Sequence, residues 1–119
     1  MTILGIDHVQ IAIEPGGEDK GRRFYGELLG MEEVSKPESL AGRGGVWFKC
    51  GRQQIHCGLE SNVASSRRHP ALLTDDLDGL QRRLEGAGHP IRQEPELPAF
   101  RRFFREEPFG NRLELLQRV

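Results

Sequence analysis

Four side chains of types that bind divalent metals recur at regular positions in this chain of 119 residues. His8 and His69 lie 61 positions apart, and His56 and Glu114 lie 58 positions apart. Imidazole nitrogens and carboxylate oxygens together suit Zn²⁺, Ni²⁺, Mn²⁺ or Fe²⁺. We therefore take these four residues as candidate ligands of one divalent metal ion.

Each candidate ligand lies in a predicted strand or at its start. These strands cover residues 3–13, 53–60, 69–74 and 112–117. Apolar and polar side chains alternate along them, which is typical of a half-buried strand. His8, His56 and Glu114 fall on the face opposite the apolar residues, so we expect a ligand face that is wetter than the helix-covered face.

The order strand, helix, loop and hairpin occurs twice, which predicts an α+β protein of two tandem βαβββ units. The predicted helices, 18–30 and 75–88, each end at a glycine, Gly30 and Gly88. A repeat of this length in so short a chain indicates duplication of one unit and not a solenoid. We expect a single domain over 1–119. Its units cover 1–60 and 69–119, and the linker covers 61–68.

Composition excludes several classes of function. The net charge is −1, without the basic excess of a nucleic-acid-binding protein. No stretch approaches the roughly 20 apolar residues that cross a bilayer, so we expect a cytoplasmic protein without membrane contact. Cys50 and Cys57 are too few for a disulfide scaffold and are interpreted as buried thiols in a reducing compartment.

Each candidate ligand has an alternative explanation. A single histidine in a strand is more often a hydrogen-bonded polar residue than a metal ligand. A carboxylate between leucines is unfavourable unless it is paired or metal-bound, so Glu114 would otherwise pair with Arg112 or Arg102. His89 has no partner in the repeat and is left out of the ligand set.

The sequence resembles the vicinal oxygen chelate superfamily, which includes glyoxalase I, extradiol dioxygenases, methylmalonyl-CoA epimerase and the fosfomycin- and bleomycin-resistance proteins. The matching segments, which cover most of the chain, are GIDHVQIAI, FYGELLGM, QQIHCGLE, HPALLTDDLDGLQRRLEGAG and PFGNRLELLQ. The resemblance implies a curled mixed sheet formed by paired βαβββ units, with the helices outside and a metal inside.

By position, His8 corresponds to the first-strand histidine of this family, His69 to the histidine that opens the second unit, and Glu114 to the last-strand glutamate. His56 stands where glyoxalase I has Glu or Gln, which is a departure from the family pattern. If His56 swings out, the other three would form a facial triad like that of an iron dioxygenase.

The resemblance implies a divalent-metal-dependent, glyoxalase-like enzyme of the lyase or isomerase type. Its small oxygenated substrate would bind the metal through two adjacent oxygens, and Glu114 would act as the base. One alternative is a metal-free protein that binds a small molecule or an antibiotic, as bleomycin-resistance proteins do. The other is an extradiol-type dioxygenase, although ring-cleaving relatives are longer as a rule.

The expected partners are a small-molecule substrate and a second copy of the chain. Clustered arginines either form solvated surface or grip an anionic substrate at a pocket mouth. Aromatic residues either line a pocket or belong to the core; these are Trp47, Phe48, Phe100, Phe103 and Phe104. Single-pair relatives are usually homodimers, and the metal site lies within one chain or is shared by two.

Overall fold

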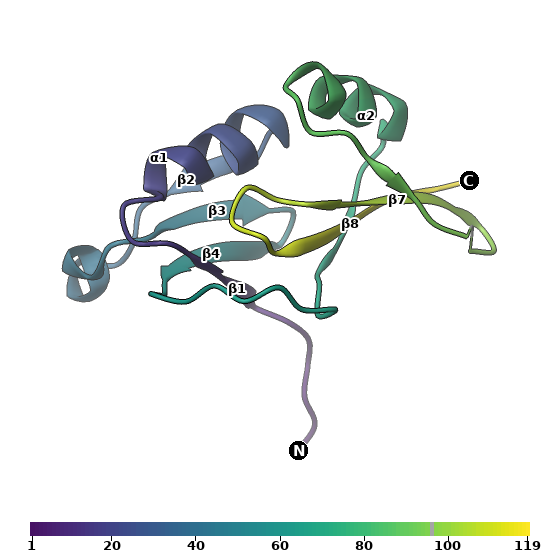
Figure 1. Ribbon diagram of the computed structural model, residues 1–119. Coiled ribbons are helices and arrows are strands. Elements are labelled where there is room, and N and C mark those ends of the chain that lie inside the picture. The colour runs from purple at the N-terminus through teal and green to yellow at the C-terminus, as the bar shows by residue number, and fades with distance from the viewer. Residues whose placement is uncertain (96) are drawn as a thin grey trace. The chain divides into compact units, whose positions relative to one another are not determined.

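The structure, a computed structural model, describes residues 1–95 and 97–119 (Figure 1). Glu96, in the loop predicted at 89–99, lies outside the described residues. No helix in the described part of the chain is long and apolar enough to cross a membrane.

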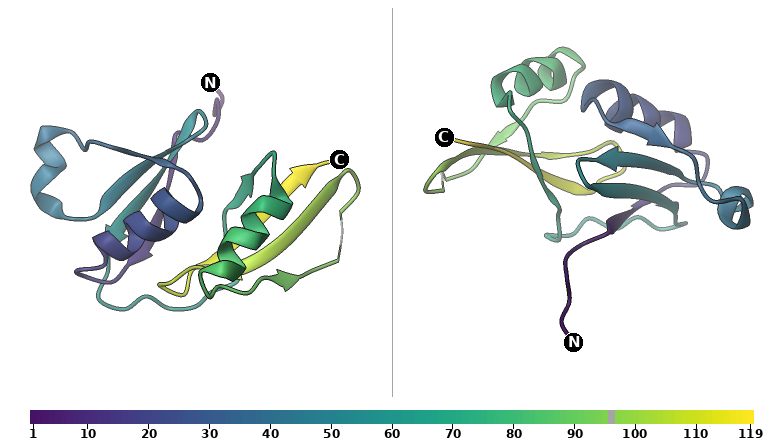
Figure 2. Two further views of the ribbon diagram at one scale, coloured as in Figure 1. Left: turned by 90° about the horizontal axis from the view of Figure 1, so that it is seen from above. Right: turned by 180° about the vertical axis from the view of Figure 1, so that it is seen from behind.

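The chain forms two compact units, Met1–Val63 and Ala64–Val119. The boundary between them falls inside the linker predicted at 61–68. Each unit contains one four-stranded mixed sheet and a helical segment that lies along one face of that sheet (Figure 2). The prediction of two βαβββ units is thereby confirmed.

Unit 1 has the strand order β1-β4-β3-β2, with β1 parallel to β4 and the other pairs antiparallel. Its strands are β1 His8–Ile13, β2 Glu32–Val34, β3 Val46–Cys50 and β4 Gln53–Leu59. Its helices are α1 Glu18–Gly21, the π-helix η1 Arg22–Leu28 and the 3₁₀-helix η2 Glu38–Arg43.

Unit 2 repeats this topology, with the order β5-β8-β7-β6 and a parallel pair between β5 and β8. Its strands are β5 Ala71–Leu73, β6 Arg92–Gln93, β7 Phe100–Glu106 and β8 Arg112–Arg118. Among the described residues of this unit, the helix is α2, Leu77–Gly86. It begins one residue after Asp76, whose side chain accepts a hydrogen bond from the Gly79 N–H at 2.9 Å and caps the helix.

Strand register shows that the repeat extends to individual residues. In unit 1, Gln10 pairs with His56, and His8 lies two residues before Gln10. In unit 2, Ala71 pairs with Glu114, and His69 lies two residues before Ala71. The four candidate ligands therefore occupy two pairs of structurally equivalent positions, as their spacing predicted.

The core of each unit is the helix-facing side of its sheet. In unit 1, Ile13, Phe24, Tyr25 and Phe48 are at most 1% exposed. The same face of unit 2 buries Leu72, Leu84, Phe103, Leu113 and Leu115. The apolar residues of both units therefore lie on the predicted face. The expectation that the opposite face is wetter is wrong at two positions, because His56 and Glu114 are only 5% and 6% exposed.

The helical segment of unit 1 differs from the regular helix predicted over 18–30. From Arg22 it widens to π spacing, so that the Leu29 N–H donates to the Phe24 carbonyl five residues back, at 3.0 Å. The widened turn leaves two successive aromatic residues, Phe24 and Tyr25, buried together. Gly30 follows with φ 77°, a left-handed conformation that ends the helix as predicted.

Both first strands are shorter than predicted, for local reasons. Residues 3–7 do not extend β1, because its partner β4 begins only at Gln53 and His8 already pairs with Gln54. In unit 2, β5 begins at Ala71 because Pro70 has no N–H to continue the ladder. His69 therefore precedes the strand instead of opening it.

Two predicted loops contain regular structure. Residues 35–44 include the 3₁₀-helix η2, and residues 89–99 include β6, whose Arg92 and Gln93 pair with β7. Neither Cys50 nor Cys57 forms a disulfide, as predicted, and Cys57 is buried whereas Cys50 is half-buried.

Leu84 provides a test of the core of unit 2, because it is 0% exposed in α2 whereas Leu73 of β5 is 62% exposed. Leu84→Ala should lower the free energy of unfolding by about 2–5 kcal/mol through lost burial and a cavity. Leu73→Ala, the matched control, should cost about 0.5 kcal/mol or less. Urea denaturation measures both; equal costs would contradict this assignment of the core.

Candidate metal centre

The two candidate ligands of unit 2, His69 and Glu114, approach each other with the atoms that could bind a metal. The Nε2 atom of His69 lies 3.1 Å from Oε1 of Glu114. Glu114 is on β8 and its side chain is 9% exposed, whereas that of His69 is 28% exposed. Two atoms bound to one metal ion at about 2.0–2.1 Å lie roughly 3 Å apart, so this pair already has the spacing of two ligands.

The hydrogen bonds of His69 indicate what lies between its Nε2 atom and Oε1 of Glu114. Its Nδ1 is 2.9 Å from the carbonyl oxygen of Arg67, which can only accept, so Nδ1 carries the ring proton. In the neutral ring, Nε2 then presents a lone pair to the carboxylate of Glu114. Two acceptors at this distance need a positive centre between them, either a second ring proton or a metal ion.

Arg102 holds the other carboxylate oxygen of Glu114. Its Nη1 donates to Oε2 at 3.3 Å, and its side chain is 16% exposed. The ion pair considered as an alternative role for Glu114 therefore exists with Arg102. Arg112 instead lies over the ring of Phe104, at 5.6 Å from its centroid. The pairing leaves Oε1 directed at His69, so it is compatible with metal binding.

The two candidate ligands of unit 1 meet differently, face to face. The rings of His8 and His56 are stacked, with centroids 4.0 Å apart and planes 16° from parallel. Nδ1 of His8 donates to the Asp7 carboxylate at 2.9 Å. A carboxylate on Nδ1 leaves Nε2 as the atom for a metal, a common arrangement of metal-binding histidines.

His56 is enclosed on several sides. Trp47 stacks on its ring with centroids 3.6 Å apart and planes 4° from parallel. Its Nε2 lies 2.8 Å from Oε1 of Gln54, which accepts the ring proton. The residue is 5% exposed. Burial lowers the pKa of His56 below its ordinary value, and His8 lowers it further, so the ring is neutral near pH 7.

Among the described residues, no three His, Cys, Asp or Glu side chains gather into a cluster that could hold a metal. Each unit instead supplies one pair from the predicted set, His8 with His56 and His69 with Glu114. The chemistry of the donors fits a divalent metal, since Nε2 of His8, Nε2 of His69 and Oε1 of Glu114 are all oriented by partners on their other polar atoms.

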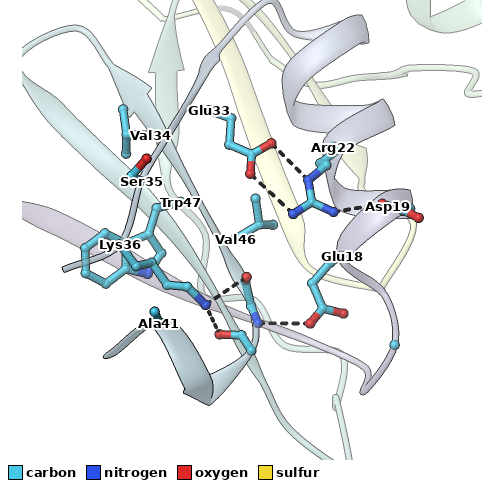
Figure 3. A pocket seen from close by; sticks show the side chains of 13 residues that line it. Glu18, Asp19, Arg22, Glu33, Val34, Ser35, Lys36, Ala41, Val46 and Trp47 are labelled. Atoms are coloured by element: carbon cyan, nitrogen blue, oxygen red, sulfur yellow. Dashed lines mark hydrogen bonds and ion pairs between the residues drawn. The ribbon is translucent and has the colours of Figure 1, made fainter. Parts of the chain in front are cut away.

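Unit 1 also contains a cavity of about 430 Å³ between its helical segment, β2 and the start of β3 (Figure 3). Trp47 is among its lining residues, so the cavity borders the same side chain that stacks on His56. Its charged lining residues are Glu18, Asp19, Arg22, Glu33 and Lys36.

These charged groups bind one another and the backbone around the cavity (Figure 3). Arg22 donates to Glu33 through Nε at 2.9 Å and to Asp19 through Nη1 at 2.7 Å. Glu18 accepts the Gly45 N–H at 3.0 Å, and this hydrogen bond lowers the pKa of Glu18. The network holds the loop before β3 against the helix, and it is thus a structural feature of the cavity wall.

Sequence reasoning did not identify the ring stack or Gln54. One signal was available: a two-residue turn at Gly51-Arg52 pairs Cys50 with Gln53 and hence Trp47 with His56, as the structure shows. The contact between Gln54 and His56 depends on side-chain rotamers, which the register does not specify. Of the other aromatic residues, Phe48 and Phe103 are core, Phe104 is buried on the ligand face beside His69 and Glu114, and Phe100 is half-buried.

Arg102 provides a test of the Glu114 environment in metal-free protein. Arg102→Leu should lower the free energy of unfolding by about 1–3 kcal/mol, because a buried carboxylate loses a charged donor. Arg101→Leu is the control: Arg101 pairs with Asp78 on the surface, where an exposed pair is worth about 0–1 kcal/mol. An equal, small loss in both variants, measured by urea denaturation, would show that Glu114 does not depend on Arg102.

Comparison with solved structures finds proteins that are similar to this chain over its whole length. The chain is similar to a Bacillus anthracis protein described as a glyoxalase family protein, with 44% identity and a TM-score of 0.92, covering 100% of this chain and 98% of that one. A search of curated proteins gave no match.

Two more distant structures share the fold. Lactoylglutathione lyase from Agrobacterium tumefaciens is 21% identical with a TM-score of 0.74, covering 98% of this chain and 96% of that chain. The fosfomycin resistance protein FosX from Listeria monocytogenes, solved with Mn(II) and sulfate, is 15% identical with a TM-score of 0.80, covering 99% of this chain and 93% of that one.

A family model matches residues 5–115, nearly the whole chain. The resemblance drawn from the sequence motifs is thereby confirmed: this protein belongs to the Glyoxalase/Bleomycin resistance protein/Dioxygenase superfamily.

Proposed function

We propose that this protein is a divalent-metal-dependent, glyoxalase-like enzyme of the lyase or isomerase type. His8, His69 and Glu114 would hold the metal, and His56, the fourth residue of the predicted set, stacks on the His8 ring. One observation carries the proposal: Nε2 of His69 and Oε1 of Glu114 face each other 3.1 Å apart, while Nδ1 of His69 already donates to the Arg67 carbonyl. That arrangement is what a bound cation would stabilise.

The metal would act as a Lewis acid for a substrate bound through two adjacent oxygens. Glu114 is the candidate base: once Oε1 is released from the metal, this oxygen would take a proton from the carbon next to those oxygens and return it to the neighbouring carbon. Arg102, bound to Oε2, would keep the carboxylate oriented during this transfer. His69 is oriented in turn by the Arg67 carbonyl.

The relatives support the coarser features of this proposal. A fosfomycin resistance protein of the same fold was solved with Mn(II), and a lactoylglutathione lyase shares the fold. For this chain we propose Zn²⁺, Ni²⁺, Mn²⁺ or Fe²⁺. The half-buried Arg102 suits an anionic small-molecule substrate.

We further propose a homodimer and a cytoplasmic location. Each unit supplies two of the predicted ligands, so a complete site needs one unit of each kind, from one chain or from two. The two units together would act as one domain. Cys50 and Cys57 as thiols outside any disulfide are in keeping with a reducing compartment.

Metal content tests the site directly. Protein purified without a His-tag or chelator should contain about one metal ion per chain, the stoichiometry of a single site with three or four protein ligands. Glu114→Ala should lose it, and His89→Ala, which removes a histidine outside the set, should keep it. Elemental analysis provides the measurement.

The melting temperature gives a second readout of the same variants. Adding metal to the stripped protein at about 100 times its dissociation constant should stabilise the fold by about 2.7 kcal/mol. If neither wild type nor His89→Ala contains metal, and none of the four metals raises the melting temperature, the metal-free binding function replaces the enzyme.

Proton exchange tests Glu114 as the base with simple model compounds in place of the natural substrate. Metal-loaded protein in D₂O should exchange the carbon-bound proton of small hydroxyketones, followed by NMR. Glu114→Gln keeps an oxygen donor but cannot accept the proton, so exchange per bound metal should slow by about 10²–10⁴-fold.

Glu85→Gln is the matched control for this exchange, because it makes the same chemical change at an exposed position of α2. It should leave the rate unchanged. Equal exchange by wild type and Glu114→Gln, at equal metal content, would exclude Glu114 as the base.

A further inference from the structure

Three aromatic rings form a stack across the ligand face of the unit 1 sheet. They come from neighbouring strands: His8 from β1, His56 from β4 and Trp47 from β3. Because β4 is the middle strand of the three, His8 and Trp47 cover opposite faces of the His56 ring. The centroid separations are 4.0 Å for His8–His56 and 3.6 Å for Trp47–His56.

This stacking conflicts with joint metal binding by His8 and His56. A metal bound to imidazole lies in the ring plane, along the lone pair of the nitrogen. The two ring planes are only 16° from parallel at a centroid separation of 4.0 Å. The line where the two planes meet is several times farther from the rings than a metal–nitrogen bond of about 2.0–2.1 Å. One ion cannot lie in both planes while the rings remain stacked.

The equivalent pair in unit 2 has the opposite geometry. His69 approaches Glu114 with its Nε2 atom, at 3.1 Å from a carboxylate oxygen. The residue that faces Glu114 across the strands, Phe104, meets the His69 ring edge-on at 5.1 Å. The same two repeat positions thus bring donor atoms together in unit 2 and ring faces together in unit 1.

The polar edge of His56 is also engaged. In His8 and His69, Nε2 is the nitrogen available to a metal. In His56, Nε2 instead donates a hydrogen bond to Gln54. His56 is 5% exposed, while the His8 side chain is 42% exposed with Nδ1 held by Asp7. Of the two histidines, His8 therefore has Nε2 available for a ligand, whereas His56 stacks on one face of the His8 ring.

The geometry points to His56 as a positioning residue and not a metal ligand: stacked between Trp47 and His8, it orients the His8 ring so that Nε2 of His8 is the nitrogen of this pair that binds the metal. This inference rests on the proposed function.

The stack itself is tested in metal-free protein. NMR of the His8 ring protons should show the upfield shift caused by a stacked neighbouring ring. His56→Phe keeps an aromatic ring without any nitrogen donor and should keep the shift; His56→Ala should lose it. Retention of the shift in His56→Ala would overturn the role of His56 in orienting His8.

Metal binding separates the two roles of His56. With Zn²⁺ as the probe in calorimetric titrations, His56→Phe should bind as tightly as wild type. His56→Ala and Trp47→Ala should bind about 10- to 100-fold more weakly, the usual effect of removing a group that orients a ligand. His8→Phe should abolish binding.

Trp47 is the only tryptophan of the chain, so its fluorescence reports on the stack during the same titration. It should change little when Zn²⁺ binds, because the His56 ring stays in place. Loss of Zn²⁺ binding in His56→Phe, or a large fluorescence change in wild type, would show that His56 leaves the stack to bind the metal, and would overturn this inference alone. Absence of Zn²⁺ binding in wild type would instead overturn the proposed function, and this inference with it.

Discussion

The parallel pairing of the first and last strands of each unit is the constraint on which the candidate site depends. In unit 1 it aligns β1 with β4 so that Gln10 faces His56, and in unit 2 it aligns β5 with β8 so that Ala71 faces Glu114. A slip of one residue would turn every side chain of a strand to the opposite face. Burial of Ile11 and Ile13 on one face, and of Leu113 and Leu115 in unit 2, opposes such a slip. The apolar core therefore keeps the ligand-type side chains on the other face.

The two units keep equivalent positions for their ligand-type residues, but the contacts of these residues differ. The two last-strand residues, His56 and Glu114, occupy equivalent places, yet their surroundings differ. Glu114 is paired with the guanidinium of Arg102, as a buried carboxylate requires, and its other oxygen lies 3.1 Å from Nε2 of His69. His56 is bound by one amide and two aromatic rings, which suit a buried neutral imidazole. Replacing a carboxylate by an imidazole at one of two equivalent positions thus changes the kind of partner that each position needs.

The hydrogen-bond partners of His8 and His69 determine which nitrogen of each ring is available to a metal. Nδ1 of His8 binds Asp7 and Nδ1 of His69 binds the Arg67 carbonyl, which leaves Nε2 of each ring as the nitrogen that would bind a metal. Asp7 and Arg67 both come from the chain just before the histidine that they bind. The tautomer of each ring is therefore set by local sequence, independently of how the two units are arranged.

The sequence by itself determined the repeat, the element order, the face of each strand and the family, because these depend on periodicities of two and 3.6 residues and on motifs that are local in the chain. It also left Arg102 as one of two possible partners of Glu114. Only the tertiary structure decided that Arg102 and not Arg112 makes that pair, that Pro70 stops β5 after His69, and that His56 is stacked instead of pointing a nitrogen at His8. These outcomes depend on side-chain rotamers and on which strands are neighbours, and spacing along the chain specifies neither.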